Sequence, residues 1–216
     1  MFRNKKSTWV FYGLSLLSPL LLYMAAVFIA TALLRAFHAV NADLYGIPLG
    51  ALLVIHPAHK MILADGKKGI IIPGDSRKRR IWPAAFAAGA CFSLIAGIAM
   101  QNLGFERHFS NIVQERLFSV SLIGQILFWG IMIPAAEELI HRGLVYPRLR
   151  SRLGMWPSAA IEALIFAVGH GNVIQGVYAF PAGIVLCLLR EYGGLESAIA
   201  FHAGANLLSV IYNCLI

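Results

Sequence analysis

Charged residues are absent from several long stretches of this chain, and these stretches set its architecture. A helix needs about 20 apolar residues to cross the roughly 30 Å hydrocarbon core of a bilayer, and most of the stretches reach that length. The predicted spans are 9–34, 44–64, 81–103, 117–136, 173–189 and 195–216. A short helix at 141–152 and another that begins after Pro157 complete the set. The pattern predicts an all-α, polytopic transmembrane helical bundle with seven to eight helices.

The composition is that of a membrane protein and excludes a soluble globular domain. Hydrophobic residues make up 59% of the chain and charged residues 13%, whereas soluble domains have about 45–50% and roughly 25%. The first apolar block is too long for the core of a signal peptide, so we expect it to be retained as a span. No internal repeat is visible. We expect one integral membrane domain, with N-terminal helices over 1–116 and a C-terminal helical core over 117–216.

The excess of positive charge, a formal net charge of +8, lies mainly at the ends of the predicted spans. Basic residues precede the first span, and segment 60–80 contains the run RKRR at 77–80. Cytoplasmic loops of membrane proteins collect lysine and arginine. We therefore expect the N-terminus and segment 60–80 to be cytoplasmic and to contact anionic lipid of the bilayer, and segment 104–116 to lie outside. The same distribution argues against a nucleic-acid partner.

Polar residues within the apolar segments form three groups. They are EELIHR at 137–142, FAVGH at 166–170 and HAGAN at 202–206. Ionisable groups inside a bilayer cost about 2.5–3.5 kcal/mol each even on the most lenient scale, and they usually mark function. A histidine in a membrane helix is also often a hydrogen-bonded packing residue. Three such groups in one chain favour a functional site.

Helical spacing gives each group an internal geometry. Glu138 and Arg142 are four residues apart, so they share a helix face and can pair. Glu137 is then free to point into a cavity. The same spacing recurs in the other two groups, in the pairs Phe166 with His170 and His202 with Asn206. A carboxylate and an imidazole can activate water, and a polar pair can stabilise a developing oxyanion.

The ordered set of motifs resembles that of the CAAX-protease and bacteriocin-processing family, also called the Abi family. EELIHR fits the pattern EExxxR, FAVGH fits FxxxH and HAGAN fits HxxxN, on successive helices over 117–216. Members of this family are glutamic-type intramembrane endopeptidases related to the eukaryotic CAAX prenyl endoprotease. The resemblance implies a peptide hydrolase that acts on a membrane-associated protein or peptide and needs no cofactor and no metal.

The resemblance also implies roles for individual residues. Glu137 would be the water-activating base, with His170 as its partner. The groups that stabilise the tetrahedral intermediate would be His202 and Asn206. Supporting roles would fall to the remaining motif residues, Glu138, Arg142 and Phe166.

Two further polar residues, His141 and Glu162, lie near the motifs but outside the family pattern. Many relatives have an aromatic residue where this chain has His141. That histidine is four residues from Glu137 and could tune it, but we expect it to face the membrane interface. Glu162 is little more than a turn from Pro157, so we expect it to be an interfacial residue and not a catalyst.

Helical rise constrains how the motifs can meet. His170 lies roughly 20 Å along its helix from the predicted start, whereas Glu137 is near the predicted cytoplasmic end of its span. The two residues meet if the helix that carries Glu137 continues well beyond Arg142, or if the helix of His170 is set deep. The family resemblance favours the first arrangement, with a site below the interface.

Two other hypotheses use the same residues. In a zinc-dependent membrane protease, Glu137, His170 and His202 would be metal ligands, although the chain has no HExxH motif. In a transporter or a non-catalytic scaffold, the cluster would relay protons or bind a partner. The compact size favours a bacterial inner-membrane protein. It therefore favours a leader peptide, sorting tail or membrane-bound regulator as substrate over a prenylated CAAX protein.

Overall fold

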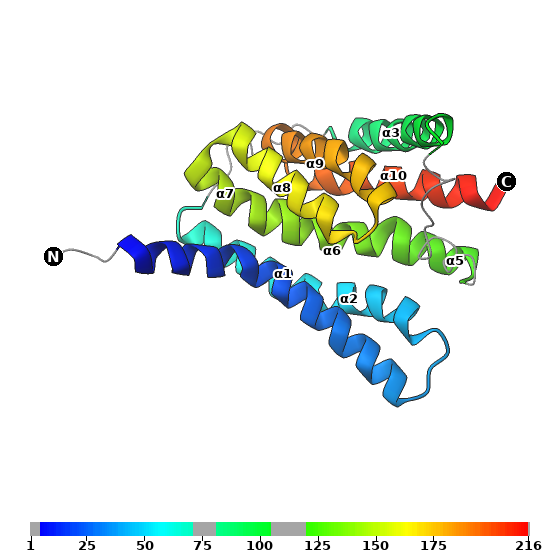
Figure 1. Ribbon diagram of the computed structural model, residues 1–216, viewed down its shortest axis with the longest axis horizontal. Helices are drawn as coiled ribbons and strands as arrows, with labels where there is room; N and C mark the ends of the chain where they lie inside the picture. The colour runs from blue at the N-terminus through cyan, green and yellow to red at the C-terminus, as the bar shows by residue number, and fades with distance from the viewer. Residues whose placement is uncertain (1–4, 71–80, 105–119, 216) are drawn as a thin grey trace.

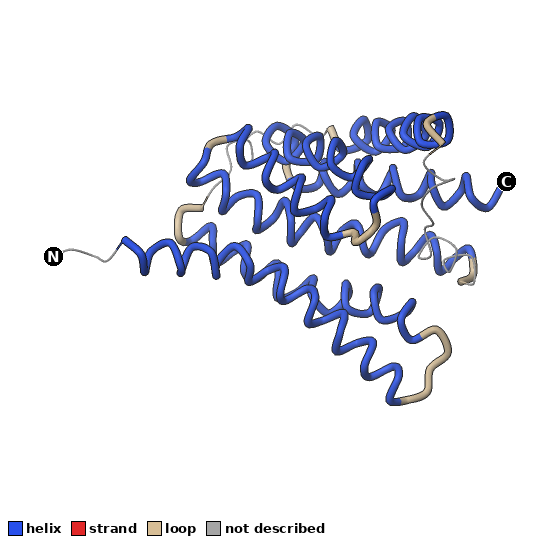
Figure 2. Tube along the Cα trace, in the orientation of Figure 1, coloured by secondary structure: helices blue, strands red, loops and turns tan. Residues whose placement is uncertain are grey.

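The structure, a computed structural model, describes residues 5–70, 81–104 and 120–215. These residues form helices and turns without a strand, as the apolar pattern predicts. Seven continuous helices result: α1 (Lys5–Ala36), α2 (Ala42–Lys67), α3 (Trp82–Asn102), one long helix (Leu122–Leu153), α8 (Met155–Gly169), α9 (Val173–Gly193) and α10 (Leu195–Leu215). Figures 1 and 2 show them packed as a bundle. The RKRR run and most of segment 104–116 lie outside the described residues.

Five of these helices are long and apolar enough to cross a membrane, which confirms an integral membrane protein. They are Tyr12–Ala36, Ala42–Lys67, Trp82–Asn102, Leu122–Leu153 and Val173–Gly193. We also predicted a span over 195–216, but α10 is not among the five that the described residues provide.

The long helix corrects one prediction. We expected a span ending at 136 and a separate helix at 141–152, but the chain is helical from Leu122 to Leu153. Its parts are α5 (Leu122–Gln125), η2 (Ile126–Met132), α6 (Ile133–Ile140), η3 (His141–Val145) and α7 (Tyr146–Leu153). Charged residues do not end this helix because neighbouring helices supply partners for them. The helix that carries Glu137 therefore continues well beyond Arg142, as the family resemblance favours.

Two segments of the long helix, η2 and η3, are wound as π-helix, and each ends just before a proline. Pro134 and Pro147 cannot donate to the carbonyl four residues back and would clash with it. The residue at that position is a glycine in both cases, Gly130 and Gly143. A wider turn relieves the clash and frees backbone carbonyls, and π-turns are frequent at functional sites. The two π-turns lie on either side of α6, which carries Glu137.

The helix α8 folds back along the long helix at Gly154. The φ of Gly154 is 82°, a left-handed conformation that glycine adopts without steric cost. With 15 residues, α8 is only about 22 Å long and cannot cross a hydrocarbon core of roughly 30 Å. His170 lies as far along the chain after Gly154 as Glu138 lies before it. The antiparallel course therefore brings the first and second motifs to a similar depth.

Small residues let the outer helices approach closely, a common device in membrane bundles. A Cβ added at Gly50 of α2 would lie 2.5 Å from the Cα of Val27 on α1. A Cβ at Gly204 of α10 would collide with the backbone of Phe86 on α3. Figure 1 accordingly shows α1 and α2 as one hairpin and α3 beside α10.

The long helix lies between two apolar cores. On one side, Val54 and its neighbours on α2 pack against Ala136 and Ile140. A second core joins α3, α8, α9 and α10 around Phe166 and Leu186. The face of the long helix that points toward α8, α9 and α10 carries the polar residues of the first motif.

Candidate active site

The ion pair predicted from helical spacing is present and buried. Arg142 Nη1 lies 3.0 Å from Glu138 Oε1, and both side chains are completely buried. Arg142 also donates through Nη2 to the carbonyl oxygen of Gly183 on α9, at 3.2 Å. The guanidinium is thus fixed between the long helix and α9.

Arg142 has a second carboxylate partner, and the contacts continue in both directions. Arg142 Nη2 lies 3.1 Å from Glu162 Oε2, and Glu162 Oε1 lies 2.6 Å from His141 Nδ1. On the other side, Glu138 Oε1 lies 2.9 Å from His202 Nδ1. We call the series His202, Glu138, Arg142, Glu162 and His141 the buried charge chain. It joins the first and third motifs to two residues that the family pattern does not specify, His141 and Glu162.

The prediction that His141 and Glu162 lie at the interface is wrong. Both residues are buried, and no part of Glu162 is exposed. Nearness to the start of α8 misled the prediction, because α8 folds back on the long helix and turns Glu162 toward η3. The Cys187 thiol on α9 also donates to Glu162 Oε2, at 3.3 Å, so α9 contacts this carboxylate as well.

Phe166 is the ring around which the motifs meet. The ring centroid of Phe166 lies 4.7 Å from that of His170, 5.0 Å from that of His141 and 5.7 Å from that of His202. All three imidazoles meet it edge to face, while the Arg142 Cζ lies 4.4 Å from its centroid. Arginine over an aromatic face is a favourable cation–π arrangement. The expected contact of Phe166 with His170 is present, together with three others.

The two adjacent glutamates differ in accessibility. The Glu137 side chain retains 20% of its exposure, whereas Glu138 has none. Glu137 Oε2 lies 3.8 Å from His202 Nε2. Because Nδ1 of His202 is held by Glu138, Nε2 is the nitrogen that faces Glu137. His202 therefore connects both carboxylates of the first motif.

His170 is oriented by its own helix. Its Nδ1 lies 2.8 Å from the carbonyl oxygen of Phe166, so Nδ1–H donates and Nε2 of the neutral ring keeps a lone pair. Among the described residues, no ion pair joins His170 to Glu137. The direct partnership implied by the family resemblance is not seen, and the imidazole paired with Glu137 is that of His202.

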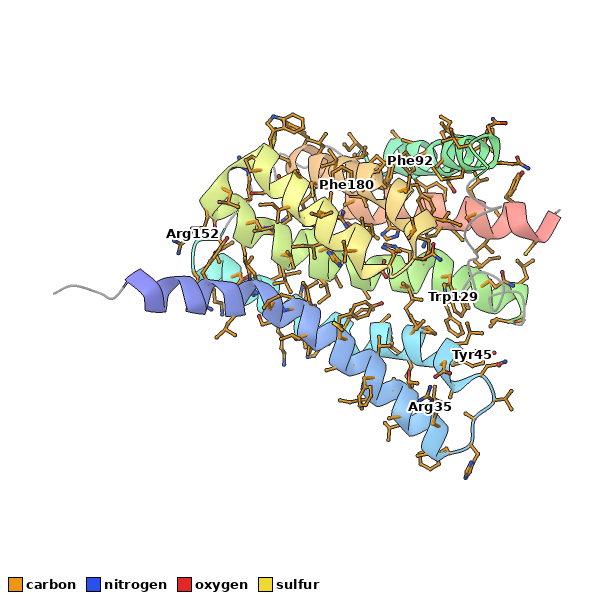
Figure 3. All side chains as sticks on the ribbon, in the orientation of Figure 1. Arg35, Tyr45, Phe92, Trp129, Arg152 and Phe180 are labelled. Carbon is orange, nitrogen blue, oxygen red and sulfur yellow. The ribbon has the colours of Figure 1, made fainter. Side chains whose placement is uncertain are left out.

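Asn206 is held by the first π-turn. Its Nδ2 donates to the carbonyl oxygen of Trp129 in η2 at 2.9 Å. Figure 3 shows the Trp129 side chain on the side of the long helix that faces the α1–α2 hairpin. The residue therefore uses its backbone for Asn206 and its ring for packing. Only one of the two amide protons of Asn206 is needed for this bond.

The metal hypothesis requires a convergent set of ligands. Among the described residues, no three His, Cys, Asp or Glu side chains are grouped as a metal site. Glu137 and His202 lie together, but the Nδ1 of His170 is directed to the Phe166 carbonyl. The donor arrangement that the zinc hypothesis needs is not seen in these residues.

A comparison with known protein families finds a match over the region that contains these site residues. Residues 119–208 match the Rce1-like family model, described as type II CAAX prenyl endopeptidase Rce1-like. The match covers less than half of the chain, and over these residues the chain is similar to that family. This Rce1-like region contains the three motifs and confirms the resemblance seen in the sequence. It supports a protease of the CAAX type. No curated protein and no solved structure shows a significant similarity to the chain.

Proposed function

We propose that this chain is a glutamic-type intramembrane endopeptidase that hydrolyses a peptide bond of a membrane-associated protein or peptide. The observation that carries the proposal is the double contact of His202. This residue lies 2.9 Å from the buried Glu138 and 3.8 Å from the accessible Glu137. A carboxylate that remains accessible beside an imidazole fixed by a second carboxylate is suited to general-base catalysis.

Glu137 is the base in this mechanism. Its carboxylate accepts a proton from water, and the hydroxide adds to the carbonyl carbon of the scissile bond. The proton then passes to the amide nitrogen as the C–N bond breaks, which releases an amine and a carboxylic acid. The Nε2 lone pair of His170 supplies a second acceptor for the same water, because Nδ1 is occupied by the Phe166 carbonyl.

His202 and Asn206 stabilise the oxyanion. With Nδ1 bonded to Glu138, an imidazolium at His202 directs its Nε2–H toward the reacting carbonyl. Asn206 contributes the amide proton that the Trp129 carbonyl does not use. Fixed donors at the point where negative charge develops typically contribute about 10²–10³-fold to the rate.

The depth of the site limits the substrate. The helix α8 is too short to cross the bilayer, and His170 follows its last residue. A substrate must therefore enter the membrane to reach the site, as a transmembrane segment or an embedded tail does. We propose a leader peptide, sorting tail or membrane-bound regulator of a bacterial inner membrane. The family description is that of a CAAX prenyl endopeptidase, so a prenylated CAAX peptide should be tested beside these substrates.

Replacement of the base tests the proposal. Glu137→Gln keeps the size of the side chain and removes the proton acceptor, so cleavage should fall by about 10²-fold or more. The control is Glu196→Gln, which removes an exposed carboxylate at the start of α10. The measurement compares new N-terminal peptides in membranes of cells that express the parent chain or either variant. Membranes that do not differ between the parent and Glu137→Gln would favour a transporter or scaffold.

Removal of metal separates the glutamate mechanism from zinc catalysis. Purified protein should keep its activity after prolonged phenanthroline treatment, because Glu137 and His170 act on water directly. A zinc enzyme would lose the ion to the chelator, since its imidazole and carboxylate ligands compete for it. Activity that disappears and returns only with zinc would overturn the proposed roles.

The proposed orientation places the N-terminus in the cytoplasm and the α1–α2 turn outside. Val40 in that turn is 81% exposed, so a Val40→Cys variant should react with an impermeant maleimide in intact cells. The exposed cysteines Cys91 and Cys214 are first replaced by serine. Labelling that requires broken cells would reverse the orientation.

A further inference from the structure

The buried charge chain contains two residues to which the proposed reaction gives no task. Glu162 and His141 lie beyond Arg142, on the side away from His202. Both are buried, and the 2.6 Å contact between them is the shortest contact within the buried charge chain. Burial of a charged carboxylate is costly unless partners compensate it, so a purely incidental position for Glu162 is unfavourable.

Charge balance ties this pair to the site. Two carboxylates, those of Glu138 and Glu162, contact the guanidinium of Arg142, and a third, that of Glu137, lies 3.8 Å from His202. Two negative charges then remain, and the two imidazoles in contact with these carboxylates balance them if each is protonated. The imidazoles are those of His141 and His202. A change of charge at one end of the buried charge chain should therefore alter the protonation of the histidine at the other end.

Arg142 provides the connection. Its Nη1 lies 3.0 Å from Glu138 and its Nη2 lies 3.1 Å from Glu162, so both carboxylates contact the same positive charge. If Glu162 lost its charge, Arg142 would form an ion pair with Glu138 alone. Less negative charge would then remain on Glu138 to hold the proton of His202.

We propose that Glu162 and His141 form a positioning pair, which sets how much of the Arg142 charge reaches Glu138 and thereby keeps His202 as an imidazolium. The proposal rests on the proposed function, in which that imidazolium donates to the oxyanion. It concerns residues that the family pattern does not specify. In place of the interfacial role that the sequence suggested, the pair controls a catalytic histidine that lies three ion pairs away from Glu162.

Other titratable and charged groups face this region and remain unchanged in the experiment. Tyr23 of α1 lies near Glu137, and His170 of α8 meets the Phe166 ring. On α9, Arg190 donates to the carbonyl of Arg142, Cys187 contacts Glu162, and Glu191 pairs with Arg150 of α7. On α2, Asp65 pairs with Arg148 of α7. Differences between variants therefore isolate the positioning pair.

The test follows the protonation of His202 directly. Full-length protein is labelled with ¹⁵N-histidine, purified in detergent and titrated by NMR, with the His202 signal assigned from its loss in His202→Gln. Nearby charges commonly move such transitions by about one pH unit or more. The pH at which His202 loses its proton should fall by about that amount in Glu162→Gln and rise in His141→Phe. In the double variant, which removes one charge of each sign, it should return to the parent value.

Opposite shifts with recovery in the double variant support the pair, because a merely structural role has no reason to reverse sign. Shifts in one direction, or none, overturn it. Glu196→Gln controls for the loss of a distant carboxylate, and His141→Gln replaces His141→Phe if that variant does not accumulate. The titration needs no substrate. Inactivity of Glu137→Gln therefore tests the proposed function separately, and active Glu137→Gln with opposite His202 shifts would reject only the proposed function.

Discussion

The N-terminal and C-terminal regions of this protein are each stabilised by a different kind of interaction. The α1–α2 hairpin packs through small residues, and its Arg35–Asp43 ion pair, in which the Arg35 side chain is 65% exposed, lies in its turn. The helices from Leu122 onward surround a network of fully buried charges centred on Arg142. A membrane scaffold can be built from close helix contacts alone, whereas buried charge is costly and is commonly retained for function. The difference is consistent with our proposal that the second region carries catalysis and the first supports it.

Loss of the central arginine should produce the largest effect on stability. Arg142→Ala leaves Glu138 and Glu162 buried without their common partner, which should cost about 3–5 kcal/mol. Its counterpart in the hairpin, Arg35→Ala, breaks an exposed pair worth less than about 1 kcal/mol. Thermal unfolding in detergent and abundance in membranes measure both. Equal losses for the two variants would remove the contrast between the regions.

Much of this contrast is local enough to be predicted from the sequence. The pairs Glu138–Arg142 and Phe166–His170 follow from spacing within one helix, and both are present. The apolar blocks predicted the helices for the same reason. The order of the three motifs along the sequence was enough to suggest the family, although the contacts between the motifs were unknown.

The rest depends on contacts between helices, which spacing does not specify. The break predicted after 136 assumed that charged residues end a span, but Glu162 and Gly183 provide partners for Arg142 within the bundle. His141 and Glu162 are on different helices, and only the turn at Gly154 brings them together. One local signal was available: Glu162 is four residues before Phe166 and lies on nearly the same stripe.

A buried ion pair, Arg148 with Asp65, links the two regions, and its removal should have the next largest effect. Arg148 of α7 lies 2.6 Å from Asp65 of α2, and it also bonds the Ser15 carbonyl of α1 and the Ser18 hydroxyl. Asp65→Ala leaves a buried guanidinium unpaired, which should cost about 3 kcal/mol. Because this link is far from Glu137 along the long helix, kcat should change little in the fraction that remains folded. A large fall in kcat with unchanged stability would show that the hairpin shapes the site.

Two glycine substitutions sharpen the comparison further. Gly204→Ala forces α10 away from Phe86, and Gly50→Ala forces α2 away from Val27. Each should cost about 1–3 kcal/mol, as overpacking does. Only Gly204→Ala should also lower kcat, because α10 carries His202 and Asn206. Gly97→Ala is the control, since a Cβ there meets nothing within 4 Å. Equal kcat values for Gly204→Ala and Gly50→Ala would separate α10 packing from catalysis.

The smallest expected effect is at the turn end of the hairpin. There Tyr45 of α2 meets Phe128 of η2 edge to face, with ring centroids 6.4 Å apart, and Phe128 is adjacent to Trp129, whose carbonyl holds Asn206. Tyr45→Leu keeps apolar bulk and removes the ring contact, which is worth about 0.5–1.5 kcal/mol. The melting temperature should fall slightly. The kcat should stay within about twofold, because Asn206 bonds a backbone carbonyl of Trp129, whose position is set by the π-turn and not by the Tyr45 ring. A matched Phe92→Leu variant removes a ring contact of α3 with Phe201 on the opposite side of the bundle. If Tyr45→Leu alone lowered kcat tenfold, the hairpin would have to be counted as part of the active site and not as its support.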